Sequence, residues 1–189
     1  ALHDDVLFVA NTDAVLAFDY VEGSTQIDTP GRAVLALPAQ APNSHWTKNL
    51  LLDVESNRLF VAVGSNSNIG ELGPMQEAGR AAIWSVDLET FGAEIYARGL
   101  RNPVGRALNP RTGALWTAVN ERDQLGDDLV PDYLAEVAQG DDYGWPTRYW
   151  GVLRDPRVPE DWFEAADGVN NPSGITGQQT GAQSPKVRI

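Results

Sequence analysis

Three short segments of this chain carry side chains whose types and spacing can support chemistry. His45 is one of two histidines, the other being His3 near the first residue, and is the candidate general base. Arg101 and Asn102 offer a guanidinium and an amide that can bind an anionic planar ligand. Residues 120–128 crowd acidic and amide oxygens around a glycine, and hard cations such as calcium prefer oxygen ligands.

Each of these segments also has an ordinary structural explanation. A lone histidine is more often structural or on the surface, and Asn102-Pro103 is common in turns. The acidic segment does not match EF-hand spacing and can simply be a solvated loop. No Walker loop, dinucleotide glycine fingerprint or nucleophile elbow occurs in the sequence, which weakens nucleotide-dependent chemistry and serine hydrolysis.

A repeated sequence unit positions the three segments. Leu7–Ala10, Leu59–Ala62 and Leu115–Ala118 resemble one another at intervals of roughly 50 residues, a period typical of propellers. A strand, a tight turn and a strand are expected around the second and third copies, with Asn57 and Gly113 at turn positions that tolerate positive φ. Further strands follow each copy, so one repeat holds about four strands.

The repeats predict an all-β fold, a β-propeller of four-stranded antiparallel blades. We expect blade repeats around 5–40, 48–100 and 104–150, followed by a long loop rich in Gly, Asn and Pro at 151–184. Propellers usually close with about four to eight blades, so three blades indicate a fragment, or half of a ring that another copy completes by self-association. The long loops 64–79 and 120–133 are expected to emerge on one face of the ring.

Composition narrows the partners. With 42% hydrophobic residues and no apolar run near the roughly 20 residues of a membrane helix, the sequence predicts a globular protein without a membrane span. The net charge of -12 argues against nucleic acid and anionic lipid as partners and favours a neutral or cationic partner, or calcium. The absence of cysteine excludes disulfides, thiolate catalysis and zinc–thiolate sites.

Three motifs together resemble those of a known family. They are His45–Leu50, Gly99–Gly105, and the segment 120–128 followed by Tyr143–Pro146. In this order and spacing they resemble the soluble glucose/sorbosone dehydrogenases, and the sorbosone-dehydrogenase-like branch fits best. The family consists of six-bladed propellers that use pyrroloquinoline quinone with calcium. The resemblance spans roughly residues 45–150 and implies that the chain is about half of such a ring.

The resemblance implies roles for three residues. His45 resembles the base that removes a proton from the sugar's anomeric hydroxyl while a hydride passes to the quinone. Arg101 and Asn102 resemble the pair that holds the quinone's oxygens and polarises it. The family's remaining basic residues around the cofactor lie in later blades, so we expect the isolated chain to carry only part of the site.

The resemblance also implies a calcium site in the acidic loop. The family binds this calcium through the carbonyls of a Gly-Pro pair, and these places fall on Arg122 and Asp123 here. An aspartate at that place either adds a carboxylate ligand or indicates a different metal geometry. Asp127 and Asp128 match an acidic pair that either holds a metal or braces the loop.

The predicted function is oxidation of an aldose or related sugar of the glucose or sorbosone type. One alternative is a calcium-dependent sugar lactonase on a propeller, in which a metal-bound water attacks the lactone. The other is a non-catalytic propeller that binds sugar or protein. The family resemblance implies a periplasmic or extracellular location and a separate electron acceptor of unknown identity.

Overall fold

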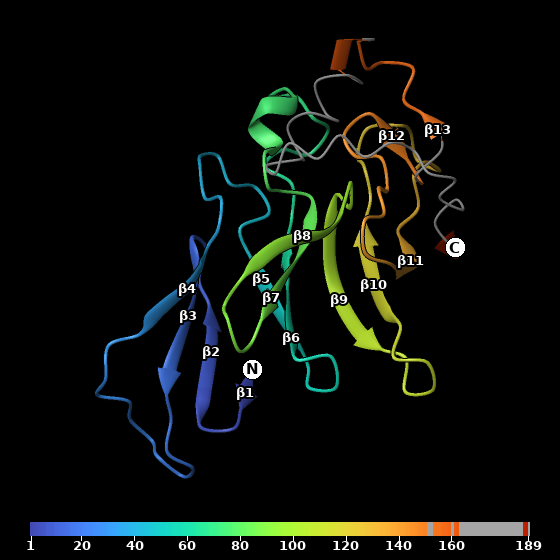
Figure 1. Cartoon of the computed structure of the whole chain (residues 1–189). Helices are drawn as coiled ribbons and strands as arrows, with labels where there is room; N and C mark the ends of the chain where they lie inside the picture. Colours follow the sequence, from blue (N-terminus) through green and yellow to red (C-terminus); the bar gives the residue numbers. More distant parts are fainter. Residues whose placement is uncertain (151–152, 160, 163–186, 189) are drawn as a thin grey trace.

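Three four-stranded antiparallel sheets form most of the described chain (Figure 1). The computed structural model describes residues 1–150, 153–159, 161–162 and 187–188. In the first sheet the strands follow chain order: β1 (Leu2–His3), β2 (Val6–Ala10), β3 (Ala14–Asp19) and β4 (Arg32–Ala36). The second sheet is built in the same way from β5 (Lys48–Asp53), β6 (Arg58–Val63), β7 (Ala82–Asp87) and β8 (Ala93–Arg98).

The third sheet takes its edge strand from the far end of the chain. Its order is β14-β11-β10-β9, with β9 (Asn102–Leu108), β10 (Leu115–Asn120), β11 (Tyr133–Val137) and β14 (Val187–Arg188). The remaining described elements are the pair β12 (Arg148–Tyr149) and β13 (Leu153–Arg154) and the 3-10 helix η1 (Pro74–Glu77). Most of the predicted loop 151–184, which separates β11 from its partner β14, lies outside the described residues.

The predicted turn chemistry is present in the two hairpins. Asp53 and Asn109 each accept a hydrogen bond from a backbone amide two or three residues further on. Asn57 and Gly113 have φ values of 56° and 69°, the left-handed region that asparagine and glycine tolerate best. These local choices set the register of β5 with β6 and of β9 with β10.

The second sheet lies between the other two, and β6 shows why the fold is a propeller. Leu59, Val61 and Val63 pack in one core with residues of the first sheet, whereas Phe60 packs in another with residues of the third. Because successive side chains of a strand point to opposite faces, burial of both faces makes β6 almost continuously apolar. Stacked sheets that cover one another's faces confirm the predicted β-propeller blades.

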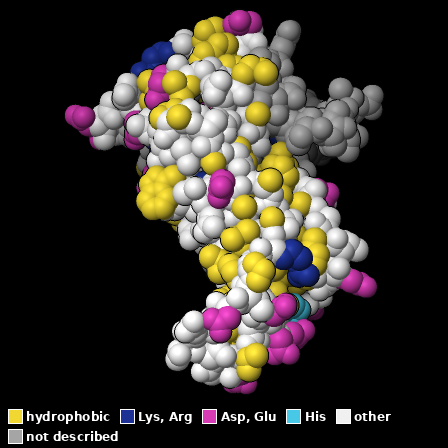
Figure 2. Space-filling model, turned by 90° about the vertical axis from the view of Figure 1, so that its left-hand side faces the viewer, with side chains coloured by type: hydrophobic (Ala, Val, Ile, Leu, Met, Phe, Trp, Pro, Cys, Tyr) yellow, Lys and Arg dark blue, Asp and Glu magenta, His cyan; other side chains and the backbone are white. Residues whose placement is uncertain are grey.

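The first sheet keeps one face that no other described strand covers. Leu7 pairs with Phe18 and Val9 with Leu16, and these side chains alternate with the buried core positions. Figure 2, which looks onto the molecule from the side of the first sheet, shows hydrophobic side chains spread over its surface. A half-covered apolar face of this kind is what a further blade would cover in a closed ring.

The ends of the strands gather the long connections at one end of the three sheets. The connections after β4, β6, β8 and β10 leave from the same end because neighbouring strands are antiparallel. Figure 1 shows η1, β12 and β13 at this end, above the sheets. No helix among the described residues is long and apolar enough to cross a membrane.

Candidate active site

His45 lies in the connection between β4 and β5 and is held by the first residues after β6. Its Nδ1 is 2.9 Å from Ser65 Oγ and 3.1 Å from Ser65 O. The Ser65 hydroxyl donates its own hydrogen to Ser67 O at 2.7 Å, and a carbonyl oxygen only accepts. The Nδ1 atom is therefore the donor, and a neutral His45 ring carries its basic lone pair on Nε2.

The surroundings favour the neutral form of this ring. Burial lowers the pKa of His45, and the guanidinium of Arg101 lowers it further, followed by a smaller effect of Arg80. The Ser65 carbonyl and Asp123 act in the opposite direction but do not reverse the shift. A neutral imidazole with one fixed nitrogen and one available nitrogen is the arrangement that a general base requires.

Arg80 holds the backbone around His45. Its side chain is fully buried, and it donates to the carbonyl oxygens of Gly64 at 3.0 Å and of His45 and Ser65 at 3.1 Å each. It also donates to Pro38 O and to the Asn43 side chain, on the segment that leads to His45. One guanidinium thus links the segment that leads to His45 with the loop that follows β6, and these two segments position the imidazole.

A buried carboxylate also holds the loop that follows β6. Glu77, the last residue of η1, is fully buried and accepts hydrogen bonds from the Asn66 amide at 2.7 Å and from the Ser67 hydroxyl. Burial raises the pKa of Glu77, while these two bonds and the charge of Arg80 act to lower it. Glu77 therefore fixes the loop 65–67, whose carbonyl and hydroxyl groups hold the His45 ring.

Gly64 lies between His45 and Asn102, and only a glycine fits there. A Cβ atom at this position would lie 2.5 Å from His45 Cβ and 2.6 Å from Asn102 Oδ1, far inside ordinary contact distance. The missing side chain lets the β4–β5 connection approach the start of β9. His45 and Asn102, which are far apart in the sequence, thereby flank the same point of the chain.

Arg101 and Asn102 stand at the junction of the second and third sheets. Arg101 is buried and donates to Asn68 O at 2.8 Å, to Glu121 O, and to Asp123 Oδ2 at 2.6 Å. Asn102 begins β9 and makes one long side-chain bond, from its Nδ2 to Asn120 Oδ1 at 3.5 Å. A shift in register at Ala118/Val119 redirects this end of the strand pair.

The Tyr143–Pro146 motif forms a wall beside Arg101. The Arg101 guanidinium lies 5.7 Å from the centre of the Trp145 ring, which is itself buried. Gly99 has a φ of 71°, and a Cβ at this position would clash with the backbone amides of Tyr143 and Gly144. The Tyr143–Pro146 motif therefore packs directly against the Arg101 segment.

The four residues that the sequence suggested for a metal site are not gathered at one point. Asp123 pairs with Arg101, and Arg122 forms an ion pair with the buried Asp155 at 2.7 Å. Asp127 and Asp128 are exposed, with no hydrogen bond or ion pair to any residue that the structure describes. Within this described part, no three acidic or histidine side chains lie close enough together to hold a metal ion.

Glu121 is a buried acid at the edge of this site. It is 3% exposed, its Oε1 accepts a hydrogen bond from the backbone amide of Arg122, and its Oε2 has no hydrogen-bond partner in the described part of the chain. Burial raises its pKa to about 7, although Arg101 acts in the opposite direction. The Glu121 carbonyl binds Arg101, so this titrating residue is directly connected to the guanidinium beside the candidate base.

The structure brings together some of the predicted site residues and adds others. His45, Arg101, Asn102 and Asp123 lie around the meeting point of the loops 64–79 and 120–133, which do emerge at one end as expected. Sequence reasoning missed four supporting residues, Gly64, Ser65, Glu77 and Arg80, and it included Glu121 only as a member of the acidic segment 120–128. Only Gly64 had a local signal, because it directly ends the apolar run of β6.

A comparison with known families identifies the class. The model of the TrAA12-like family matches residues 1–136, and the chain belongs to this family. Over 150 residues it is 29% identical to the aldose sugar dehydrogenase YliI of Escherichia coli (strain K12). Over 177 residues it is 26% identical to the pyrroloquinoline quinone-dependent sugar dehydrogenase of Hypocrea jecorina (strain QM6a).

The fold has the same relatives among solved structures. A calcium structure of the Trichoderma reesei Carbohydrate-Active Enzymes Family AA12 protein matches with a TM-score of 0.66 and 24% identity, over 83% of this chain and 46% of that one. The two curated relatives match 72% and 79% of this chain, which covers 38% and 41% of their own lengths. The chain therefore spans less than half of the relatives it matches.

Proposed function

We propose that the protein oxidises an aldose or related sugar, of the glucose or sorbosone type, by hydride transfer to pyrroloquinoline quinone. The chain described above contributes one part of the site. The observation that carries the proposal is the pairing across Gly64, which sets a histidine with an available Nε2 beside the Arg101-Asn102 pair. The names of the curated relatives, both sugar dehydrogenases, support the same reaction.

The side chains have distinct roles in this reaction. His45 accepts the proton of the sugar hydroxyl at Nε2, while Ser65 fixes the other ring nitrogen and so the orientation of the ring. Burial and the nearby Arg101 disfavour the resulting imidazolium, so the proton is readily released after the reaction. When bound, pyrroloquinoline quinone supplies the hydride acceptor.

The donor set around Arg101 suits an anionic, planar cofactor. Among the described residues, the Asn102 amide makes only a 3.5 Å hydrogen bond, and the carboxylate paired with Arg101, that of Asp123, is half exposed. An anionic ligand can therefore replace Asp123 at the guanidinium and take the Asn102 amide as a further donor. Arg101 and Asn102 are the residues we assign to the cofactor.

Calcium is the second proposed cofactor, with Arg122, Asp123, Asp127 and Asp128 as the proposed loop positions around it. Of their side chains, Asp123 alone has a carboxylate at the Arg101 cluster. The family motif uses two backbone carbonyls, so the carbonyls of Arg122 and Asp123 are the oxygens that correspond to it, and the Asp123 carboxylate is a further candidate ligand.

The lactonase alternative needs several carboxylates that converge on a metal. Among the described residues no such group of three exists, and Arg122 and Asp123 are each engaged with a partner of opposite charge. The binding-module alternative would leave His45 without a chemical role, although its ring has a fixed tautomer and a lowered pKa. The dehydrogenase is therefore the function that we propose.

The test adds pyrroloquinoline quinone and calcium to this chain and to a longer protein that completes the ring. Absorbance reports cofactor binding, and an artificial electron acceptor with a panel of aldoses reports oxidation. We expect acceptor reduction that His45→Ala abolishes and that His3→Ala, a histidine change in the first strand, leaves intact. Failure of both proteins to bind the quinone would reject the proposal in favour of a lactonase or a binding module.

We also propose a periplasmic or extracellular location and a six-bladed ring. The quinone dependence in the name of one relative supports the proposed location. The apolar face of the first sheet that no other described strand covers supports the ring. Blade ranges around 5–40, 48–100 and 104–150 remain part of this proposal, as does completion of the ring by later blades or by a second copy. Cell fractionation and the mass of the protein in solution test the two statements.

A further inference from the structure

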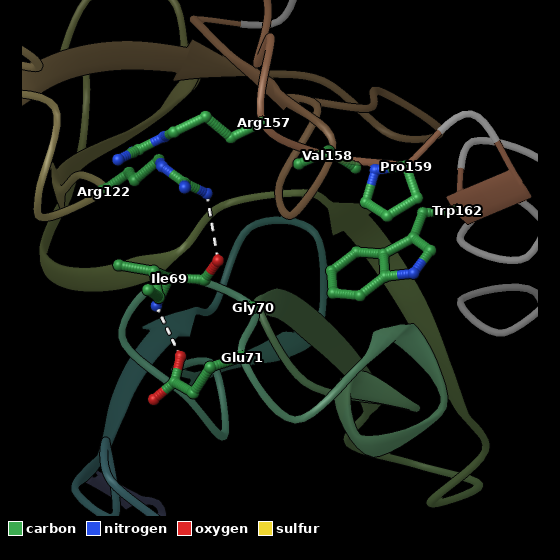
Figure 3. Close-up of a pocket in the computed structure, with 8 residues that line it drawn as sticks. All are labelled: Ile69, Gly70, Glu71, Arg122, Arg157, Val158, Pro159 and Trp162. Atoms are coloured by element: carbon green, nitrogen blue, oxygen red, sulfur yellow. Dashed lines mark hydrogen bonds between the residues drawn. The ribbon is translucent and has the colours of Figure 1, made fainter.

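A cavity of about 220 Å³ lies next to the candidate active site (Figure 3). The turn 69–71 of the β6–β7 connection forms one side, and residues 157–159 with Trp162 form another. Arg101 binds the carbonyl of Asn68 and Arg122 binds the carbonyl of Ile69, at 2.8 Å and 3.0 Å. Because the two arginines hold consecutive carbonyls of one turn, the cavity and the Arg101 cluster share a wall.

Arg122 provides an unused donor in this wall. Its side chain is 5% exposed, and its Nη1 contacts Asp155 at 2.7 Å and Ile69 O at 3.0 Å. Its Nε is buried and has no hydrogen-bond partner among the residues that the structure describes. A buried guanidinium donor without a partner carries a desolvation cost that a bound acceptor would remove.

The charges around the cavity favour an anionic ligand. Arg122 and Arg157 share one carboxylate, that of Asp155, whose side chain is 1% exposed. Glu71 also lines the cavity, but its carboxylate accepts hydrogen bonds from the backbone amides of Asn68 and Ile69, and in Figure 3 it lies on the far side of Ile69 from Arg122. Glu121 is a further negative charge near Arg122. The chain as a whole carries a net charge of -12, so two guanidiniums in the lining of one cavity are a distinct local feature.

The opposite wall is apolar and suits the face of a sugar ring. Figure 3 shows the Trp162 indole and the Pro159 ring together on the side of the cavity away from the two arginines. The Trp162 ring also packs against the turn at Gly70, where a Cβ would lie 3.3 Å from its Cζ3. The volume is below the roughly 300 to 1,000 Å³ of sites for drug-sized ligands, so one ring fills it.

We propose that this cavity binds a carboxylate-bearing pyranose unit, with the carboxylate on Arg122 and Arg157 and the ring face on Trp162. The proposal rests on the proposed sugar oxidation in one respect: it names the cavity as a subsite next to the Arg101 cluster, so that acidic saccharides are the preferred substrate class. Binding itself requires neither the quinone nor an electron acceptor.

Calorimetric titration of the chain with D-glucuronate tests the subsite. D-glucose provides the ring without the carboxylate, and acetate provides the carboxylate without the ring. We expect saturable binding of glucuronate, at least about tenfold tighter than that of glucose or acetate, and weakening as salt is raised. Equal binding of glucose or of acetate, or no binding of glucuronate, would overturn the assignment.

Two variants locate the binding. Arg157→Gln is the first because this side chain is 45% exposed, whereas replacing Arg122 would leave the buried Asp155 carboxylate without its closest partner. Trp162→Ala removes the apolar platform, and Arg111→Gln in the β9–β10 turn is the matched control. We expect about tenfold weaker glucuronate binding in Arg157→Gln and in Trp162→Ala, and unchanged binding in Arg111→Gln. Unchanged binding in both Arg157→Gln and Trp162→Ala would refute the proposal. Loss of acceptor reduction with retained glucuronate binding would instead count only against the proposed oxidation.

Discussion

Replacing Gly64 with alanine is expected to disturb stability and the site together. The new Cβ would stand 2.5 Å from His45 Cβ and 2.6 Å from Asn102 Oδ1, whereas ordinary contacts begin near 3.4 Å. Each neighbour must therefore retreat by about 1 Å. Overpacking of this kind costs roughly 1–3 kcal/mol of unfolding free energy, and a 1 Å misplacement of a catalytic group costs roughly a hundredfold in rate.

Gly105→Ala is the matched control, because a Cβ there meets only Ala118 Cβ at 3.6 Å. Urea unfolding followed by tryptophan fluorescence measures the stability of both variants, and quinone-dependent acceptor reduction in the ring-completed protein measures the site. We expect Gly105→Ala to remain within about 0.5 kcal/mol of the parent chain. If Gly64→Ala unfolds at the same urea concentration as Gly105→Ala and keeps its activity, the close approach of His45 and Asn102 is wrong.

Three other perturbations examine the charges around His45. Arg80→Met should lower the unfolding free energy by about 3 kcal/mol or more, because the buried carbonyls of Gly64, His45 and Ser65 lose their hydrogen-bond donor. The control Arg111→Met, at an exposed arginine, should change it by less than about 0.5 kcal/mol. Equal thermal midpoints for the two variants would contradict the hydrogen bonds assigned to Arg80. Arg101→Gln should raise the pKa of His45, since the guanidinium lowers it, and NMR titration of the ring measures this shift; an unchanged or lower pKa would show that the two groups are not close. Burial raises the Glu121 pKa to about 7, so the contribution of the protonated carboxyl to the unfolding free energy is complete below its usual pKa of 4.5 and disappears as the pH rises through 7. Glu121→Gln should therefore be more stable than the parent chain at pH 8, and this advantage should vanish near pH 4. A constant difference in unfolding free energy across that range would argue against a buried titrating acid.

Much of the fold follows from local sequence. The repeated tetrads that begin at residues 7, 59 and 115 lie in β2, β6 and β10, and the further strands expected after each copy are present as β3 and β4, β7 and β8, and β11. The hairpin turns use Asn57 and Gly113 at positive φ as expected. Such features are encoded within about ten residues, because alternation and turn propensity depend on near neighbours.

The site depended on more than local sequence. His45, Arg101 and Asn102 stand out by residue type and motif, so the sequence alone nominated them. Their mutual placement depends on three sheets that align their connections at one end.

Only the tertiary structure showed that Arg80 donates hydrogen bonds to the carbonyls of both His45 and Ser65, and that Glu121 is buried. It also separated the acidic loop residues, since Asp123 pairs with Arg101 while Asp127 and Asp128 remain exposed. Burial, pKa and ion pairing are properties of the surroundings in space, and these surroundings come from segments tens of residues apart. The sequence by itself therefore determined the blades and the candidate residues, and the packing of the sheets decided which of those residues meet.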